Sequence, residues 1–159
     1  MKDVVLFAFS TSSSAATIPV TLRTVNQDLG VNQNVASFVV PVGATINMDG
    51  TAIMQGLATV FIAQMSGIDL TLFQYIQVVL LAVATSIGTA AVPSAGTITL
   101  IIILQQFNLP LEAIGIILAV DRVLDMIRTS VNVTGDAAIA CIVAKTENQL
   151  DENIFNSKA

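Results

Sequence analysis

Five polar residues recur at helical spacing in an otherwise apolar segment near the C-terminus. They are Asp121, Asp125, Arg128, Asn132 and Asp136, and at about 100° per residue they share one face of a helix. A guanidinium group binds a carboxylate through two parallel hydrogen bonds, and a carboxylate accepts hydrogen bonds from an ammonium group. Burying so many charges for packing alone is unfavourable. The stripe therefore favours a site for a charged substrate over the alternative, a soluble core in which Asp125 and Arg128 only neutralise each other.

Two short segments repeat a similar polar pattern. Residues 47–51 (Asn-Met-Asp-Gly-Thr) and residues 132–136 (Asn-Val-Thr-Gly-Asp) each follow a candidate hairpin. Small hard cations bind to the oxygens of carboxylates, amides and backbone carbonyls, and a broken helix exposes such carbonyls. Asp49 and Asp136 are therefore predicted to be ligands of a small cation such as sodium.

The segments that must position these residues are apolar stretches that approach the length of a bilayer span and are then interrupted. A span needs about 20 apolar residues, and irregular backbone at membrane depth is tolerated only where it lines a cavity or is buried in protein. Interrupted segments in both halves indicate a transporter core built from inverted repeats. The sequence predicts an all-α membrane protein with two re-entrant helical hairpins and two transmembrane helices, one of them broken. The predicted elements are a hairpin at 1–31, a broken helix at 32–66, a hairpin at 67–107, a last helix at 108–146 and a polar tail at 147–159.

The composition excludes several classes of function. Of the 159 residues, 54% are apolar and 11% are charged, and the net charge is −5. Soluble domains contain about a quarter charged residues, so the lipid bilayer is the expected surrounding, and a soluble helical binding protein is the less favoured alternative. An acidic chain does not favour nucleic acid as a partner. Because the chain has no histidine and a single cysteine, zinc sites and histidine-based catalysis are excluded, and no enzyme activity is expected.

Basic residues other than the two arginines of the last helix predict the orientation. Lysine and arginine accumulate in loops on the cytoplasmic side of a membrane. We therefore expect a multi-pass protein of the cell membrane, inner or plasma, with a cytoplasmic C-terminus. The residues that carry this prediction are Lys2, Arg23, Lys145 and Lys158.

Four motifs carry a resemblance to a known family. They are the serine-rich tip at 12–14, GATINMDGT at 43–51, VPSAG at 92–96 and DMIRTSVNVTGD at 125–136. At these residues the sequence resembles the dicarboxylate/amino acid:cation symporter family, that of the glutamate transporters and their prokaryotic homologues, over residues 5–148. The resemblance implies hairpin one, the seventh helix, hairpin two and the eighth helix of a homotrimeric elevator transporter. It also implies that the first six helices, which include the scaffold, are absent from this chain.

The resemblance implies a binding site for an acidic amino acid. In it, Ser14 and Asn132 hold the α-carboxylate of the substrate, and Asp125 holds its ammonium group. Arg128 and Thr51 hold the side-chain carboxylate, and the backbone of the second hairpin tip closes over the substrate. The implied substrate residues are Ser13, Ser14, Thr51, Val92, Pro93, Gly96, Asp125, Arg128, Thr129 and Asn132.

The resemblance also implies sodium as the coupling ion, with no other cofactor. One site would use backbone carbonyls with the Asp136 carboxylate, and a second would use backbone oxygens beside Met48. A third would use the side chains of Asp49 and Asn47 with groups from a helix outside this chain, so it is incomplete here. The implied sodium ligands are Gly43, Thr45, Asn47, Met48, Asp49, Ser86, Ile87, Thr89, Asn132 and Asp136.

Several positions depart from the pattern of the family. Gln55 stands where the potassium-antiporting animal members carry glutamate, so potassium coupling is not expected. Ser12 and Met126 stand where different members carry an arginine, and Arg122, one turn before Met126, is expected to supply a local positive charge. Ser94 replaces a common glycine or glutamine and adds a hydroxyl group near the substrate.

The function predicted from these observations is cation-coupled symport of glutamate or aspartate across the membrane, with sodium as the expected cation. A carrier of C4-dicarboxylates is disfavoured because the Asp125 carboxylate would repel a dianion. A carrier of neutral amino acids is disfavoured because it would leave Arg128 unpaired. Proton coupling and a non-transporting remnant that acts as an interaction module remain as alternatives, and the sequence does not choose between glutamate and aspartate.

Overall fold

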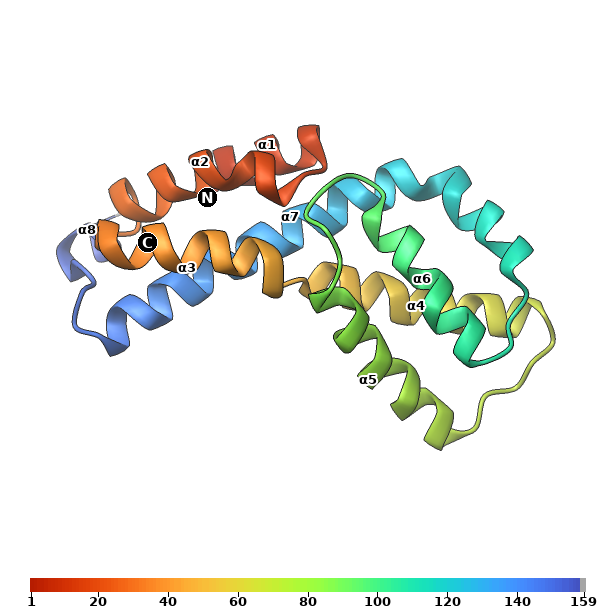
Figure 1. The fold of residues 1–159 in the computed structure, drawn as a ribbon. Helices are drawn as coiled ribbons and strands as arrows, with labels where there is room; N and C mark the ends of the chain where they lie inside the picture. Colours follow the sequence, from red (N-terminus) through yellow and green to blue (C-terminus); the bar gives the residue numbers. More distant parts are fainter. Residues whose placement is uncertain (158–159) are drawn as a thin grey trace.

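The structure is a computed structural model that describes residues 1–157 as helices joined by short connections (Figure 1). No strand occurs among these residues, and Val31 and Leu150 form an isolated antiparallel bridge. The prediction of an all-α chain is therefore confirmed. Lys158 and the end of the predicted polar tail lie outside the described residues. The elements are α1 (Lys2–Thr11), α2 (Ser14–Gln27), α3 (Gln33–Ile46), α4 (Asp49–Met65), α5 (Leu72–Ile87), α6 (Ala95–Gln106), the 3-10 turn η1 (Leu111–Ala113), α7 (Ile114–Thr146) and α8 (Glu152–Ser157).

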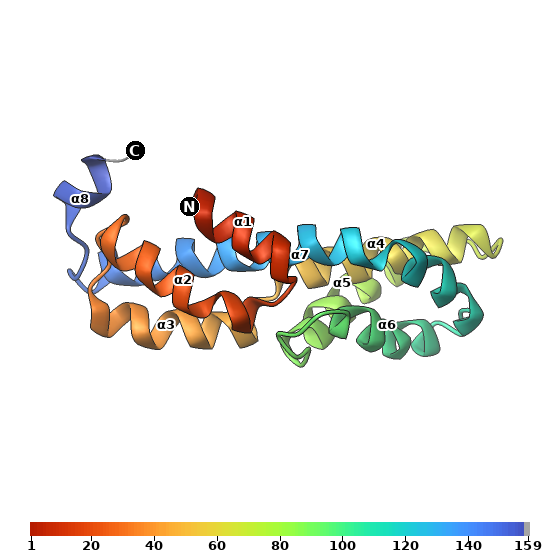
Figure 2. The same cartoon turned by 90° about the horizontal axis from the view of Figure 1, so that it is seen from above.

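The long helix α7 is the axis on which the other helices pack. Helices α1 to α3 lie along its C-terminal half and α4 to α6 along its N-terminal half, and the turned view shows the same two groups (Figures 1 and 2). Each group encloses its own apolar core, which contains Ile117 of α7 in one case and Ala140 of α7 in the other. The polar stripe of α7 therefore lies between the two cores, in the middle of the elongated molecule.

Helices α3 and α4 follow each other with a break between them (Figure 1). Helical geometry is lost at Asn47 (φ −86°, ψ 74°) and at Met48 (φ −105°, ψ 47°). Gly43 allows the end of α3 to lie against α7, because a Cβ atom there would lie 2.6 Å from Oδ1 of Asp136. The break therefore presents backbone groups to the middle of α7.

The helix pairs α1–α2 and α5–α6 are hairpins whose tips meet near the middle of α7 (Figure 1). Each tip contains a residue in the left-handed region, Ser12 with φ 51° and Ser94 with φ 61°. This region is unfavourable for residues that have a side chain, so contacts around each tip must stabilise it. At the first tip the Ser13 Oγ atom accepts a hydrogen bond of 3.2 Å from the backbone N–H of Ala16. Ser13 is therefore the N-cap of α2.

Large apolar side chains are exposed on several helices. Leu72 is 79% exposed, Phe38 is 70% exposed and Leu57 is 67% exposed, whereas Asp125 is 1% exposed. Exposed apolar area of this kind marks contact with protein or lipid. Within residues 1–157, none of the helices combines the length and the apolar character that a membrane-spanning segment requires.

Candidate functional site

The polar stripe of α7 is buried. All five of its members are at most 6% exposed, and they face the α3–α4 break and the two hairpin tips. Groups of this kind are seldom buried unless each has a partner. The partners divide the stripe into an N-terminal part, which contacts the second tip, and a C-terminal part, which contacts the break. The members are Asp121, Asp125, Arg128, Asn132 and Asp136.

The two hairpin tips contact each other directly. The Ser13 hydroxyl donates a hydrogen bond of 2.9 Å to the carbonyl oxygen of Ala91, and the Ala15 backbone N–H donates one of 3.3 Å to the same oxygen. One backbone carbonyl of the second tip therefore joins it to the first, and residues 78 positions apart in the chain lie side by side.

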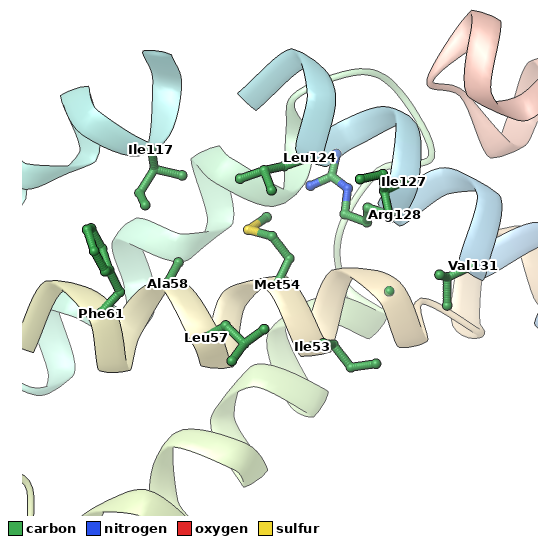
Figure 3. A pocket seen from close by; sticks show the side chains of 11 residues that line it. Ile53, Met54, Leu57, Ala58, Phe61, Ile117, Leu124, Ile127, Arg128 and Val131 are labelled. Carbon is green, nitrogen blue, oxygen red and sulfur yellow. The ribbon is translucent and has the colours of Figure 1, made fainter. Parts of the chain in front are cut away.

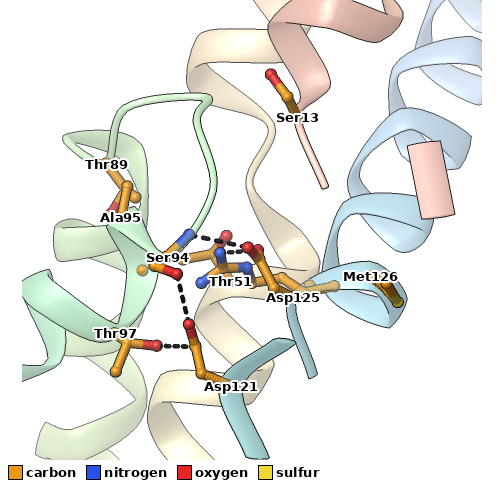
Figure 4. A network of polar contacts seen from close by, with 12 residues as sticks. Ser13, Thr51, Thr89, Ser94, Ala95, Thr97, Asp121, Asp125 and Met126 are labelled. Atoms are coloured by element: carbon orange, nitrogen blue, oxygen red, sulfur yellow. Dashed lines mark hydrogen bonds and ion pairs between the residues drawn. The ribbon is translucent and has the colours of Figure 1, made fainter. Parts of the chain in front are cut away.

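The second tip is also tied to the start of the stripe (Figure 4). The Ser94 backbone N–H donates a hydrogen bond of 2.8 Å to Oδ2 of Asp125, and the Ser94 hydroxyl donates one of 2.6 Å to Oδ2 of Asp121. The other oxygen of Asp121 accepts a hydrogen bond from the Thr97 hydroxyl. Two carboxylates of α7 therefore hold the tip of the second hairpin.

Arg128 lies at the centre of the site. Its Nη2 atom forms a buried ion pair with Oδ1 of Asp125, three residues earlier on the same helix. Its Nη1 atom is buried and has no hydrogen-bond partner among the described residues. The guanidinium packs so closely on Gly96 that a Cβ atom there would lie only 2.9 Å from its Cζ atom. One of its two terminal nitrogens therefore remains available for an acceptor that residues 1–157 do not supply.

A small cavity lies where the two tips, the α3–α4 break and α7 meet. Its volume is about 10 Å³, which is about the smallest that can hold one water molecule. Arg128 and Ser12 line it, and these two residues carry the buried side-chain polar atoms that lack a partner among residues 1–157. In this closed arrangement the cavity is too small for an amino acid. The lining residues are Ser12, Ser14, Met48, Thr51, Thr89, Ala90, Ala91, Val92, Arg128, Thr129 and Asn132.

Asn132 ties the α3–α4 break to α7. Its Oδ1 atom accepts a hydrogen bond of 2.8 Å from the backbone N–H of Gly50. Its Nδ2 atom lies 3.3 Å from the Thr51 hydroxyl and 3.3 Å from the Met48 sulfur. The first turn of α4 is therefore fixed to the cavity wall by a single amide side chain.

A second polar cluster lies at the end of the break, one turn further along α7. The Asn47 side chain donates a hydrogen bond of 3.0 Å to Oδ1 of Asp136. Gly135 faces the same cluster, since a Cβ atom there would lie 2.6 Å from Nδ2 of Asn47 and 3.4 Å from Oδ2 of Asp49. The cluster combines two carboxylates with an amide and the backbone at Gly43. This is an oxygen-rich donor set suited to a small hard cation.

The remaining predicted cation ligands are more scattered. Ser86 and Thr89 are buried. The Ser86 hydroxyl donates to the Val83 carbonyl at 2.9 Å, and the Thr89 hydroxyl, just beyond the end of α5, donates to the Thr85 carbonyl at 2.9 Å. Thr89 lines the small cavity with Met48, whereas Thr45 and Ile87 have exposed side chains that do not. Within residues 1–157 no three acidic, histidine or cysteine side chains gather in one place.

The structure brings six of the ten predicted substrate residues to the cavity wall. Among the other four, Ser13, Gly96 and Asp125 support that wall through the contacts described above, while Pro93 is exposed on the tip. The six on the wall are Ser14, Thr51, Val92, Arg128, Thr129 and Asn132.

Three residues that the structure places at the site received no binding role from the sequence. Asp121 belongs to the stripe but holds the second tip, and Ser12 lines the cavity. Gln55 is fully buried and donates hydrogen bonds of 3.0 Å to the Gly96 carbonyl and 2.7 Å to the Thr99 hydroxyl. A glutamine in the middle of an apolar helix is a signal that could have identified this support for Gly96.

A larger pocket lies between α4 and α7 (Figure 3). Its volume is about 300 Å³, and its lining is apolar apart from Arg128. Such a lining favours apolar atoms over a charged ligand. The hydroxyl and amide side chains around the middle of α7 therefore lie at the small cavity and at the cluster of Asp136, and not in this pocket. The residues that line this larger pocket include Ile53, Met54, Leu57, Phe61, Ile117 and Leu124.

Comparison with known proteins identifies the family. Residues 1–146 match the model of the sodium:dicarboxylate symporter family, and the chain belongs to this family. It is 50% identical over 136 residues to an excitatory amino acid transporter of Caenorhabditis elegans, covering 86% of the chain. It is 48% identical over 159 residues to excitatory amino acid transporter 3 of Mus musculus, covering 99% of the chain, and 51% identical over 136 residues to excitatory amino acid transporter 2 of Homo sapiens, covering 86%. The matched regions are only 27%, 30% and 24% of the length of these relatives.

Proposed function

We propose that this chain forms the substrate-binding and cation-binding core of a sodium-coupled symporter of acidic amino acids. The observation that carries the proposal is the half-paired Arg128. Its buried Nη1 atom lacks an acceptor among the described residues, and Arg128 lines a cavity together with hydroxyl and amide side chains. A buried guanidinium of this kind favours a ligand that carries a carboxylate. Membership of the sodium:dicarboxylate symporter family supports the same conclusion.

Asp125 gives the proposed site its preference for an amino acid over a dicarboxylate. In the closed arrangement this carboxylate accepts from the Ser94 backbone N–H and pairs with Arg128. A substrate ammonium group would replace the Ser94 N–H as its donor, and a substrate carboxylate would take the free side of Arg128. A dianion without an ammonium group would leave Asp125 facing negative charge.

Substrate entry requires movement of the second tip. A cavity of about 10 Å³ does not hold glutamate or aspartate, and the contacts that close it come from Ser94 and Ala91. Release of these contacts would open a path to Arg128 and Asn132. Residues 92–96 would therefore act as a gate, and closing it over the substrate would exclude water from the ion pairs.

The proposed sodium sites lie at the α3–α4 break. Asp136, Asn47 and the backbone at Gly43 form the first, and the exposed Asp49 carboxylate lies beside it. Backbone oxygens near Met48 and Thr89, which share the wall of the small cavity, form the second. Since Asn132 contacts Met48 and also belongs to the substrate site, sodium binding would order residues that the substrate needs.

The exposed apolar side chains and the buried charges suit a chain surrounded by lipid and by further protein. In the proposed arrangement the two hairpins are re-entrant, α3–α4 and α7 cross the bilayer, and the C-terminus is cytoplasmic. The complete transporter is a homotrimer in the cell membrane.

Transport is tested in a chimera in which residues 1–159 replace the matching segment of the mouse relative. The expected result in liposomes is uptake of labelled glutamate and aspartate that depends on an inward sodium gradient. Uptake driven by a proton gradient without sodium would contradict sodium coupling, and uptake of succinate in preference to either amino acid would contradict the role of Asp125.

The substrate site is tested with two arginine variants of that chimera. Arg128→Cys is expected to abolish uptake of acidic amino acids, because it removes the guanidinium group that a substrate carboxylate would pair with. Arg23→Cys, at an exposed arginine on α2, is the matched control and should retain uptake. Equal uptake by both variants would refute the assignment.

A further inference from the structure

The segment that follows α7 returns to the connection between α2 and α3 and lies beside it in both views (Figures 1 and 2). Val31 of this connection and Leu150 face each other in the isolated antiparallel bridge. We call residues 149–151 the C-terminal clamp. Its two backbone hydrogen bonds run from the Asn32 N–H to the Gln149 carbonyl, at 3.0 Å, and from the Asp151 N–H to the Gly30 carbonyl, at 2.8 Å.

The clamp depends on a close approach at Gly30. This residue has a φ of 72°, and a Cβ atom there would lie 2.5 Å from the backbone oxygen of Asp151, so a glycine is required on both counts. On its other side the clamp is anchored to α7, because the Gln149 N–H donates a hydrogen bond of 2.7 Å to the Ala144 carbonyl in the last turn of that helix. The clamp therefore joins the end of α7 to the α2–α3 connection.

The α2–α3 connection is in turn tied to α2. The Val31 N–H donates a hydrogen bond of 2.9 Å to the Val25 carbonyl, and the Asn26 side chain donates one of 2.9 Å to the Val31 carbonyl. At its other end α2 begins at the first hairpin tip, where Ser13 contacts the Ala91 carbonyl of the second tip. A series of hydrogen-bonded elements thus leads from the clamp to the meeting point of the two tips.

The second hairpin is held differently at its open end. Residues 66–71 and 107–110, which flank it, make local backbone hydrogen bonds, such as those of 2.9 Å from Ile68 to Ala63 and from Leu109 to Leu104. Among the described residues, no backbone hydrogen bond joins either flank to a segment distant in the chain. Apolar side chains pack these flanks on their core instead. Only the first hairpin therefore has a clamp.

We propose that the C-terminal clamp is a conformational device that keeps the first hairpin fixed on α7 while the second tip opens. This inference rests on the proposed gate at residues 92–96, and it assigns the difference between the two hairpins to a segment outside both of them. The clamp stays closed throughout transport. The first tip then remains in place, and the second tip can close on it again through the Ala91 carbonyl.

The first experiment loosens the clamp in the chimera, in lipid nanodiscs without substrate. Gly30→Ala places a Cβ atom against the Asp151 backbone, so hydrogen–deuterium exchange of residues 12–27 should rise at least tenfold. Exchange of residues 95–106 should stay within twofold of wild type. Gly67→Ala is the matched control, because Gly67 also has a positive φ, 68°, but its surroundings leave room for a Cβ atom. It should leave the exchange of residues 12–27 unchanged.

The second experiment locks the clamp with Val31→Cys and Leu150→Cys in a Cys141→Ser background. The two positions face each other between the flanking backbone bonds, and the Cα atoms of such pairs are about 4.5 Å apart, within the range of a disulfide. After oxidation, sodium-dependent uptake of glutamate should stay within twofold of the uptake after reduction. Each single cysteine variant, treated in the same way, controls for oxidation elsewhere.

The outcomes separate the clamp from the proposed function. Unchanged exchange of residues 12–27 in Gly30→Ala, or a rise that extends equally to residues 95–106, overturns the clamp. Uptake that is lost on oxidation of the double variant and restored by reduction also overturns it, because the clamp would then have to open during transport. If Gly30→Ala does not fold, this second experiment decides. If the wild-type chimera takes up no acidic amino acid, the proposed function fails, and the exchange experiment still decides whether the clamp holds the first hairpin.

Discussion

The Ser94 hydroxyl is expected to control how easily the second hairpin tip opens. It donates a hydrogen bond of 2.6 Å to a buried carboxylate, Asp121. A hydrogen bond to a charged group contributes about 1.5–3 kcal/mol, and each 1.4 kcal/mol changes an equilibrium about tenfold. Ser94→Ala retains the backbone N–H that binds Asp125 and removes only the hydroxyl. The tip should therefore open about 10- to 100-fold more often.

Hydrogen–deuterium exchange of the segment 88–96, followed by mass spectrometry without substrate, measures this opening. Ser94→Gly is expected to exchange less rapidly than Ser94→Ala, because glycine relieves the left-handed φ of 61°. Ser130→Ala is the matched control, since the Ser130 hydroxyl donates to the Met126 carbonyl of its own helix at 2.9 Å. Equal exchange of this segment in wild type and Ser94→Ala would refute the claim that Asp121 holds the tip.

Three further variants test other contacts at the site. Gly96→Ala places a Cβ atom against the guanidinium of Arg128, so uptake of acidic amino acids by the chimera should be lost; uptake at the wild-type level would contradict the close packing. Gln55→Leu leaves the carbonyl of Gly96 without its side-chain donor, and should destabilise the protein by about 1–3 kcal/mol, measured as a lower Tm; an unchanged Tm would show that the contact contributes little. Asp136→Asn removes a charge beside the α3–α4 break, and should weaken the apparent sodium affinity of substrate binding about tenfold, or about 1.4 kcal/mol; unchanged sodium dependence would place the cation elsewhere.

Much of the local structure could be predicted from the sequence because it depends on short-range spacing. The 3.6-residue period of a helix places Asp121, Asp125, Arg128 and Asn132 on one face whatever else surrounds them. The interruption that the structure places at Asn47 and Met48 is likewise local, because asparagine favours conformations outside a helix. The all-α class follows from such patterns, and so does the expectation that polar groups gather at the breaks.

Only the tertiary structure decided which partner each polar group has. The sequence favours Asp125 and Arg128 as ligands for opposite charges, and the fold pairs them with each other and adds the Ser94 backbone to Asp125. The Ser94 hydroxyl donates to Asp121, and the Ser12 hydroxyl has no partner within residues 1–157. Helical spacing brings Asp125 and Arg128 close together within α7, whereas the contacts of Ser94 with Asp125 and Asp121 join elements that are far apart in the chain. Their geometry depends on how both hairpins pack against α7, and no local pattern contains that information.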